Sequence, residues 1–358
     1  MQKWLEQLRN QFAARTSAAH RAALHTASAS PAPPTDADTL ATDDGLTREH
    51  VLWAYRLLLE RELDDEQVVQ EWLRACTTVR ELRTHILSSA EYQAHNRDMP
   101  LVQHSTPAIV EVPAGRGDMF RLHVNLFDMM IGLGIVRGHY ELNETAFVQA
   151  TIQPGWNVLD IGANIGYFSM LCATLAGAEG HVYAFEPMHL NAAMLARSIA
   201  ENGYAERITL TEAAVGATTG TVQITYLEQQ INSGGVHLVP EGQTGYAGHA
   251  VADVPMIVLD QIELRRPIQF IKIDIEGAEP LALRGARTLL QQDRPLIMSE
   301  VHAELLRRIG GVSVADYLAE LELLGYASHL LENGQIGSQI TSHDLDPQQV
   351  WTVVFVPR

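Results

Sequence analysis

The sequence of 358 residues predicts an α/β fold, with a mostly parallel sheet covered by helices and a small all-α module in front of it. From about residue 119 onward, short apolar runs alternate with segments of helical periodicity. These runs lack the in–out alternation of half-exposed strands, which indicates strands buried on both faces. Residues 46–96, in contrast, show helical periodicity only. The composition is that of a folded chain, because 46% of the residues are hydrophobic and 19% are charged.

The α/β part is expected to run in strand and helix pairs. The expected strands are WNVLDI (156–161), HVYAF (181–185), RITLTEA (207–213), QFIKID (269–274) and PLIMSEV (295–301), and the expected helices span 166–176, 190–202, 279–292 and 314–325. A closing apolar run at 351–356 has no helix after it and is expected to pair antiparallel at the edge of the sheet.

Three segments precede this domain, which is placed at residues 119–358. Residues 1–45 are expected to form an amphipathic helix followed by a linker rich in Ala, Pro, Ser and Asp. The helix is interpreted either as a contact with a membrane surface or a partner, or as a frayed terminal helix. Residues 46–96 form the helical module, and residues 97–118, with several prolines and glycines, are expected to be a second linker.

The helical module resembles a small domain that recurs in bacterial proteins of surface-glycan and cell-envelope assembly. The resemblance rests on LWAYRLLLERELDDEQVVQEWL and ILSSAEY, and it singles out Tyr55, Arg61, Asp64 and Tyr92. These four residues are equally explained as core and cap residues of a small bundle, which is the favoured interpretation.

Composition excludes several functional classes. The net charge of -18 is unfavourable for contact with a phosphate backbone, so no nucleic-acid partner is expected. The two cysteines offer neither a disulfide framework nor a zinc ribbon. Because no apolar run approaches the roughly 20 residues of a spanning helix, we expect a cytoplasmic protein, with a peripheral contact at the inner membrane face through residues 1–96 as an open alternative.

The first expected strand leads into a turn that is suited to a cofactor. The turn reads Asp160-Ile-Gly-Ala-Asn164-Ile-Gly-Tyr, so it lacks the G-x-G-x-x-G of a nicotinamide site and disfavours an NAD-dependent oxidoreductase. Asn164 tolerates the positive φ that a tight turn requires. Glu186 ends the second strand, 24 residues after Gly162, near the offset at which an acidic side chain meets ribose hydroxyls. Together these features favour S-adenosylmethionine (SAM), which has a bare ribose and cationic groups.

The chain resembles the FkbM family of SAM-dependent methyltransferases over about residues 138–302. The resemblance rests on five sequence segments in this order: VLDIGANIGYFS, YAFEP, ITLTEAAVG, FIKIDIEGAE and SEVH. The resemblance implies a class I methyltransferase (Rossmann-like) fold with a seven-stranded sheet whose last strand is antiparallel. It also implies O-methylation of a hydroxyl on a sugar, glycan or polyketide-type product. The implied SAM-binding residues are Asp160, Gly162, Asn164, Gly166, Glu186, Glu212 and Ala213, with Tyr140 and Glu141 in a segment that lies over the cofactor.

Charged residues at the ends of two later strands predict an acceptor site. Lys272, Asp274 and Glu276 share one face by alternation, and Glu300 and His302 do the same on the next strand. His302 is our first choice as general base and Asp274 the second. Lys272 would keep Glu276 or Glu300 ionised or stabilise an alkoxide. Two alternatives remain open: a Mg²⁺ ion bound by Asp274, Glu300 and either His302 or Glu276, and a structural ion network.

A glycine-rich segment between Tyr226 and Val251 is expected to cover the acceptor site as a mobile loop or to form a plain surface hairpin. Asn232 and Ser233 within it are candidates for binding a sugar. The leading hypothesis is therefore a SAM-dependent O-methyltransferase that acts on a small-molecule or glycan hydroxyl. The alternative is a non-catalytic SAM-binding scaffold that recruits enzymes of envelope biosynthesis.

Overall fold

A computed structural model of the chain divides it into two compact units, residues 1–100 and residues 101–358. The residues that it describes are 46–59, 63, 65–76, 78–79, 82, 85–86, 89, 107–126, 128, 130–227, 233–240 and 249–358. The predicted N-terminal helix and linker, as well as Arg61, Asp64, Tyr92 and Asn232, lie outside these ranges. Within the described ranges, no helix has both the length and the apolar character needed to cross a bilayer.

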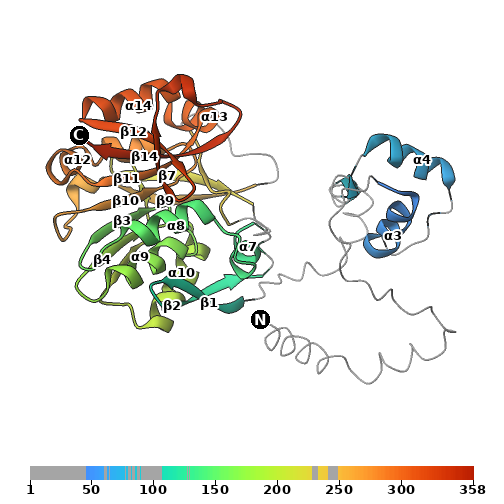
Figure 1. The fold of residues 1–358 in the computed structure, drawn as a ribbon, viewed down its shortest axis with the longest axis horizontal. Coiled ribbons are helices and arrows are strands. Elements are labelled where there is room, and N and C mark those ends of the chain that lie inside the picture. The colour runs from blue at the N-terminus through green and yellow to red at the C-terminus, as the bar shows by residue number, and fades with distance from the viewer. Residues whose placement is uncertain are drawn as a thin grey trace. The chain divides into compact units, whose positions relative to one another are not determined.

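The N-terminal unit contains helices α3 (Arg48–Leu58) and α4 (Glu66–Ala75), shown in Figure 1. Thr47 caps α3, because its side chain accepts a hydrogen bond from the backbone N–H of His50. Tyr55 is 6% exposed and accepts a hydrogen bond from Trp72 Nε1 at 2.9 Å. It is a core residue, as the favoured interpretation of the module predicted.

The second unit is built on a sheet with the strand order β13-β12-β14-β11-β10-β3-β4-β5 (Figure 1). Its strands are β3 (Asn157–Ile161), β4 (His181–Phe185), β5 (Ile208–Thr211), β10 (Phe270–Ile273), β11 (Leu296–His302), β12 (Tyr326–Glu332), β13 (Gln335–Gln339) and β14 (Val350–Pro357). The pairs from β5 through β11 are parallel, and β14 is antiparallel to both of its neighbours. The predicted mixed α/β fold with a mostly parallel sheet is confirmed.

Two details of the sheet differ from prediction. The last strand, β14, lies between β11 and β12 rather than at the edge. Its run Val353, Val354 and Phe355 is fully buried, which an interior strand explains and an edge strand would not. The sheet also has an eighth strand, β13, which forms a hairpin with β12 through Asn333 and Gly334, both at positive φ.

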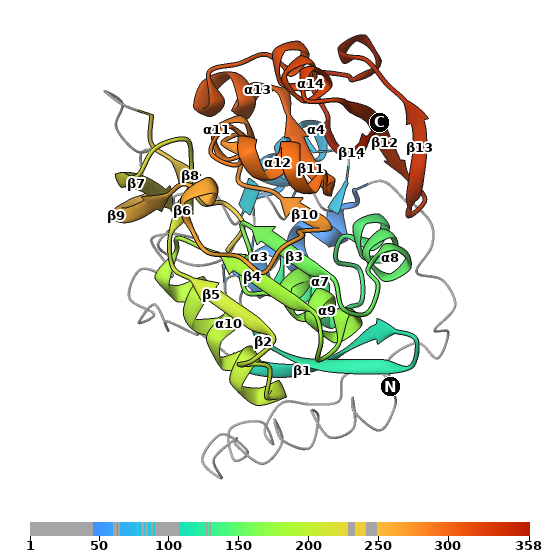
Figure 2. The same cartoon turned by 90° about the vertical axis from the view of Figure 1, so that its left-hand side faces the viewer.

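Helices cover both faces of this sheet, as Figure 2 shows. Val158 and Leu159 are neighbours on β3 but belong to two different hydrophobic clusters, one on each face. One face packs against helices α8 (Leu142–Thr151), α9 (Tyr167–Ala176) and α10 (His189–Asn202); the other packs against α11 (Glu279–Arg284), α12 (Arg287–Asp293) and α14 (Val314–Leu323).

The hairpin of β1 (Pro107–Gly115) and β2 (Asp118–Asn125) corrects the predicted linker at 97–118, because most of its C-terminal half is a strand. Phe120, Leu122 and Val124 alternate into the core that also holds α9. The prolines and glycines of the first strand resembled a linker, whereas its alternating apolar residues were the signal for a strand.

A smaller sheet of order β6-β9-β7-β8 adjoins the main one (Figure 2). It consists of β6 (Ala214–Val215), β7 (Gly220–Tyr226), β8 (His237–Leu238) and β9 (Ala250–Ile257). Because β7 and β9 are antiparallel, the glycine-rich segment connects an antiparallel pair. Its described residues 233–240 include β8 and part of the wall of a cavity.

Candidate active site

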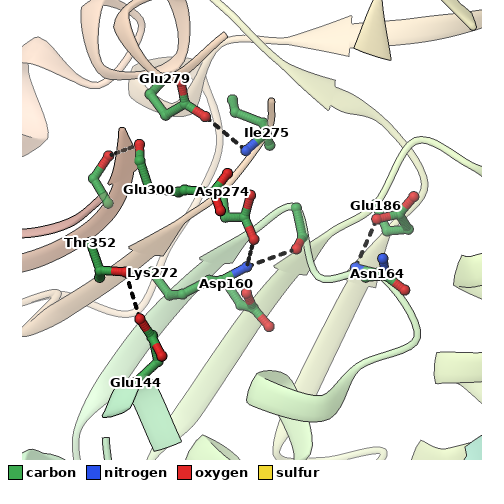
Figure 3. A network of polar contacts seen from close by, with 12 residues as sticks. Glu144, Asp160, Asn164, Glu186, Lys272, Asp274, Ile275, Glu279, Glu300 and Thr352 are labelled. Atoms are coloured by element: carbon green, nitrogen blue, oxygen red, sulfur yellow. Dashed lines mark hydrogen bonds and ion pairs between the residues drawn. The ribbon is translucent and has the colours of Figure 1, made fainter. Parts of the chain in front are cut away.

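A cavity of about 270 Å³ lies at the carboxyl ends of β3, β4, β10 and β11. In open parallel sheets, ligands bind at this edge. One end of the cavity is formed by the turn after β3 together with Glu186, and we call it the donor end. The other end is formed by Asp274, Glu276 and Glu300, and we call it the acceptor end. Figure 3 shows Asp274 and Glu300 at this end.

The turn after β3 has the backbone that the sequence predicted. Gly162, Asn164 and Gly166 all have positive φ, at 81°, 51° and 95°. Gly162 and Asn164 line the cavity, and a Cβ atom at Gly162 would overlap the carbonyl oxygen of Asp274. Gly166 does not line it; a Cβ there would collide with Leu195 of α10, so this glycine permits helix packing.

Glu186 lies at the wall of the donor end, where three donors hold it, and Figure 3 shows one of them, Asn164. Its Oε2 accepts a hydrogen bond from the backbone N–H of Asn164 at 2.8 Å, and its Oε1 accepts one from Met188 N–H at 2.9 Å. The side-chain amide of Asn191 donates to Oε1 at 3.5 Å. Burial raises the pKa of Glu186 to about 7, against the lowering effect of these hydrogen bonds. Each oxygen keeps capacity to accept a ligand hydroxyl.

Besides Gly166, two further predicted SAM-binding residues lie outside the cavity lining. Asp160 is fully buried at the end of β3, where its Oδ2 accepts a hydrogen bond from Ser169 Oγ at 2.5 Å. It acts on the site through charge, since its carboxylate contributes to raising the pKa of Lys272. Glu212 points away and contacts His189 Nδ1 at 3.0 Å, because the residues that end β5 alternate in direction. Its neighbour Ala213 does line the cavity.

Tyr140 and Glu141 line the cavity as expected. The Tyr140 ring stands edge-on to Tyr167, with 5.0 Å between centroids. Burial raises the pKa of Glu141 to about 7; Lys272 opposes this effect, and Asp274 reinforces it. This segment therefore adds a carboxyl group to a site that is already acidic.

Lys272 joins the two ends of the cavity, as Figure 3 shows. Its Nζ donates to the carbonyl oxygen of Gly162 at 3.2 Å and to Asp274 Oδ2 at 3.2 Å, and the residue is 6% exposed. Burial opposes protonation of Lys272, but the charges of Asp274, Asp160 and Glu141 outweigh it and raise the lysine pKa above its ordinary value. The ammonium thus remains charged and holds the donor turn against the acceptor end.

The acceptor end contains two carboxyl groups whose pKa is strongly raised. Burial raises the pKa of Glu276 to about 8, and the nearby carboxylates of Asp274 and Glu279 add to this effect. Burial raises the pKa of Glu300 to about 10, and repulsion from the carboxylates of Asp274, Glu276 and Glu279 adds to this effect. His237 of β8 lines the cavity beside them, with its Nδ1 3.9 Å from Glu276 Oε2. The sequence had not assigned a role to this histidine.

Glu279 holds the backbone of the acceptor end in place, and the sequence analysis did not predict this role. It is 1% exposed, and its Oε1 accepts hydrogen bonds from the backbone N–H groups of Ile275 at 2.9 Å and Gly277 at 3.2 Å. These bonds, of which Figure 3 shows the one between Glu279 and Ile275, hold the turn in which Glu276 adopts a φ of 55°. An acidic residue that follows a Glu-Gly turn by two positions was the available signal.

His302 does not line the cavity, which corrects our first choice of general base. It ends β11, and its Nδ1 accepts a hydrogen bond from the backbone N–H of Leu305, so the ring caps α13 (Ala303–Leu305). Glu300, two residues earlier, does line the cavity. His302 is still extended and paired with β14, so alternation holds at this position, but its ring caps α13 instead of lining the cavity.

The expected Mg²⁺ ion has no ligand set in the part of the chain that the structure describes, since no three His, Cys, Asp or Glu side chains there converge to hold a metal ion. Lys272 occupies the position beside Asp274 that a cation would take. The metal hypothesis is therefore not supported.

The residues at the donor end fit SAM. The spare acceptor capacity of Glu186 suits two ribose hydroxyls, and the excess of carboxyl groups suits a sulfonium and an ammonium. Apolar groups suited to an adenine ring also line the cavity: Phe185, Ala213, Ala214, Val215 and Ile224.

Comparison with known families agrees with this geometry. Residues 160–328 match the family model described as the Methyltransferase FkbM domain. The match covers 169 of the 358 residues and identifies a methyltransferase domain in this part of the chain. The FkbM match begins at Asp160 and reaches into β12, beyond the span of the resemblance seen in the sequence. A comparison with curated protein sequences gave no significant match.

Two solved structures illustrate the wider similarity. The FkbM methyltransferase from Methylobacillus flagellatus KT is 19% identical, with a TM-score of 0.38 and 85% of this chain covered. The chain spans 58% of the length of that protein. A SAM-dependent O-methyltransferase from Thermotoga maritima is 10% identical, with a TM-score of 0.37, 70% of this chain covered and 78% of that chain covered.

Proposed function

We propose that the protein is a SAM-dependent O-methyltransferase that methylates a hydroxyl of a sugar, glycan or related metabolite. The observation that carries this proposal is a single cavity with two chemically different ends. The turn at Asn164 and the bonded carboxyl of Glu186 form one end, and the carboxyl groups of Glu276 and Glu300 form the other. The FkbM domain that spans this cavity supports methyl transfer as the reaction.

Bound SAM would supply a methyl group on a positively charged sulfur. Glu186 and the Asn164 turn would hold the nucleoside part, and Lys272 would keep that turn fixed to the acceptor end. The acceptor oxygen must lose its proton as its new bond to the methyl carbon forms, and the electron pair of the breaking carbon–sulfur bond goes to sulfur. Orientation of the two reactants contributes roughly 7–11 kcal/mol to lowering such a barrier.

Glu276 is the proton acceptor that the geometry favours. It lines the acceptor end, and burial raises its pKa to about 8, which is nearer to neutral pH than the pKa of about 10 of Glu300 at the same end. Glu300, with its pKa raised to about 10, is protonated under the same conditions and would donate a hydrogen bond to the acceptor. Asp274 is paired with Lys272 and is less suited to this role.

The cellular setting is part of the proposal. The resemblance of the helical module to domains of envelope-associated proteins supports a role in bacterial envelope or secondary metabolism. We place the reaction in the cytoplasm, with residues 1–96 as the part that would contact a membrane surface or an envelope enzyme.

Methyl transfer can be tested directly with the full chain. The pure protein is incubated with methyl-labelled SAM and fractionated extract, and labelled products are identified by mass spectrometry. The proposal expects one fraction to gain an ether-linked methyl group. Binding of S-adenosylhomocysteine (SAH) without transfer to any fraction would favour the non-catalytic scaffold, and label on nitrogen or carbon would contradict O-methylation.

A further inference from the structure

A buried carboxylate outside the FkbM match connects two walls of the cavity. Asp128, in the segment before α7 (Gly132–Val136), is 2% exposed. Its Oδ1 accepts hydrogen bonds from the backbone N–H groups of Met130 at 3.0 Å and Ile131 at 2.9 Å. Both of these residues line the cavity. Asp128 itself touches no part of the main cavity, so its effect on the site passes through other residues.

The second oxygen of Asp128 is bonded to the segment after β7. Its Oδ2 accepts hydrogen bonds from the backbone N–H of Ser233 at 3.0 Å and from Ser233 Oγ at 2.5 Å. With four donors, the carboxylate is fully bonded although it is buried, which compensates the cost of removing a charge from water. Ser233 and Asp128 are 105 residues apart, so this contact joins distant parts of the chain.

Ser233 continues the network to the donor end. It lies within hydrogen-bonding distance of Asn164, with 3.1 Å between Ser233 Oγ and Asn164 Oδ1. Its carbonyl oxygen accepts a hydrogen bond from the side-chain amide of Asn191 at 3.0 Å, and the same amide donates to Glu186. Asn164 N–H also donates to Glu186. The Ser233 backbone and side chain are therefore in contact with two of the three groups that hold Glu186.

We propose that Asp128 and Ser233 are positioning residues that fix two walls of the cavity, residues 130–131 and 233–237, against the turn that binds the methyl donor. This inference rests on the proposed function, since it concerns the same cavity. It adds Asp128, which lies outside the FkbM match and was not a predicted site residue, and it gives Ser233, which was predicted to bind a sugar, a role in positioning the cavity walls.

The same anchor serves the acceptor end. His237 follows Ser233 by four residues, and its ring faces Glu276, with Nδ1 3.9 Å from Oε2. A displacement of Ser233 would therefore move groups at both ends of the cavity. Loss of a purely structural hydrogen bond elsewhere in the domain would lower stability without altering ligand affinity. A test must therefore measure stability and ligand affinity separately.

The test measures SAH binding by isothermal titration calorimetry for the full chain and for Ser233→Ala, Asp128→Asn and the double variant. We expect Ser233→Ala to weaken SAH binding on the order of tenfold, as the loss of a hydrogen bond to a charged group would. Asp128→Asn should weaken it at least as much. The double variant should bind about as well as Asp128→Asn alone, because both changes remove the same contact.

Two matched controls separate positioning from general stability. Ser198 is fully buried, and its Oγ accepts a hydrogen bond from His123 N–H at 2.9 Å away from the cavity. Asp260 accepts backbone hydrogen bonds from Thr288 and Leu289 at 2.7 Å and 2.9 Å, also away from it. Ser198→Ala and Asp260→Asn should lower the melting temperature and leave SAH affinity unchanged.

Each outcome decides the inference. Wild-type SAH binding together with unchanged affinity in folded Ser233→Ala would overturn it and leave the proposed function standing. If Asp128→Asn does not fold, Ser233→Ala decides alone, since it removes only one oxygen. Absence of SAH binding by the wild-type chain would overturn the proposed function, and this inference with it.

Discussion

The donor and acceptor ends of the cavity are built in different ways. The donor end comes from the turn after β3 and from the end of β4. Its first and last residues, Gly162 and Glu186, are 24 positions apart in the sequence. The acceptor end collects Glu276, Glu300 and His237 from three separate elements. The contrast shows that a short stretch of sequence specifies the donor end, whereas the acceptor end depends on packing between residues far apart in the chain.

Glu276→Gln should affect only the acceptor end. Loss of the proton acceptor is expected to reduce methyl transfer by about 10²- to 10⁴-fold, with SAH affinity within about twofold of wild type. In the wild-type chain the rate should rise with pH up to about 8, because Glu276, with its pKa raised to about 8, must be ionised to accept a proton. Rate measurements on the acceptor fraction across this range check both points. A Glu276→Gln enzyme that keeps full activity would remove Glu276 from the mechanism.

Lys272→Met should affect both ends at once. It leaves Asp274 and the buried Asp160 without their cation and removes the bond to the Gly162 carbonyl, so we expect a loss of about 3–5 kcal/mol in the free energy of unfolding. Urea denaturation measures it. Lys272→Arg keeps the charge but not the compact shape, and should reduce methyl transfer more than SAH binding. A fully active Lys272→Arg enzyme would refute the need for an ammonium.

Gly162→Ala should affect the donor end through shape alone. The new methyl group would overlap the Asp274 carbonyl, so the turn must move, and SAH binding should weaken by at least about tenfold. Gly203→Ala is the matched control, because Gly203 also has positive φ (66°) but open space around it. It should cost only the roughly 1–2 kcal/mol of the left-handed backbone and leave SAH affinity intact. Equal effects of the two substitutions on SAH binding would contradict the tight-turn explanation.

The smallest expected effect concerns the way in which the free energy of unfolding depends on pH. Burial raises the pKa of Glu300 to about 10 and of Glu276 to about 8 above the usual 4.5, so the folded chain keeps protons that the unfolded chain has lost. The resulting stability is complete below the unfolded pKa and is lost as pH rises through the folded values. The free energy of unfolding should therefore fall between about pH 4.5 and about pH 10. Glu300→Gln should flatten this slope and Glu304→Gln, an exposed neighbour, should not; a slope unchanged by Glu300→Gln would show that this carboxyl is not the cause.

The sequence predicted the alternation of strands and helices, the turn with Asn164 at positive φ, and the place of Glu186, because these features depend on local periodicity and spacing. It also identified Asp274, Glu276 and Glu300 as residues that converge, because strand alternation fixes their common side.

Three features could not be obtained in this way. His302 is the last residue of β11, and its ring caps α13, a local contact that strand alternation does not predict. His237 and Asp128 reach the site through pairings across long stretches of chain, which periodicity does not encode. Glu212 was assigned by resemblance, and only the geometry at the end of β5 shows that its carboxylate turns to His189.

The most direct test of the account is calorimetric titration of SAH into the wild-type chain, Glu186→Gln and Glu276→Gln in parallel. The separation of the two ends predicts one SAH per chain for the wild type, binding weakened by about 100-fold or more in Glu186→Gln, and near-normal binding in Glu276→Gln. Absence of binding by the wild type, or equal loss in both variants, would contradict it.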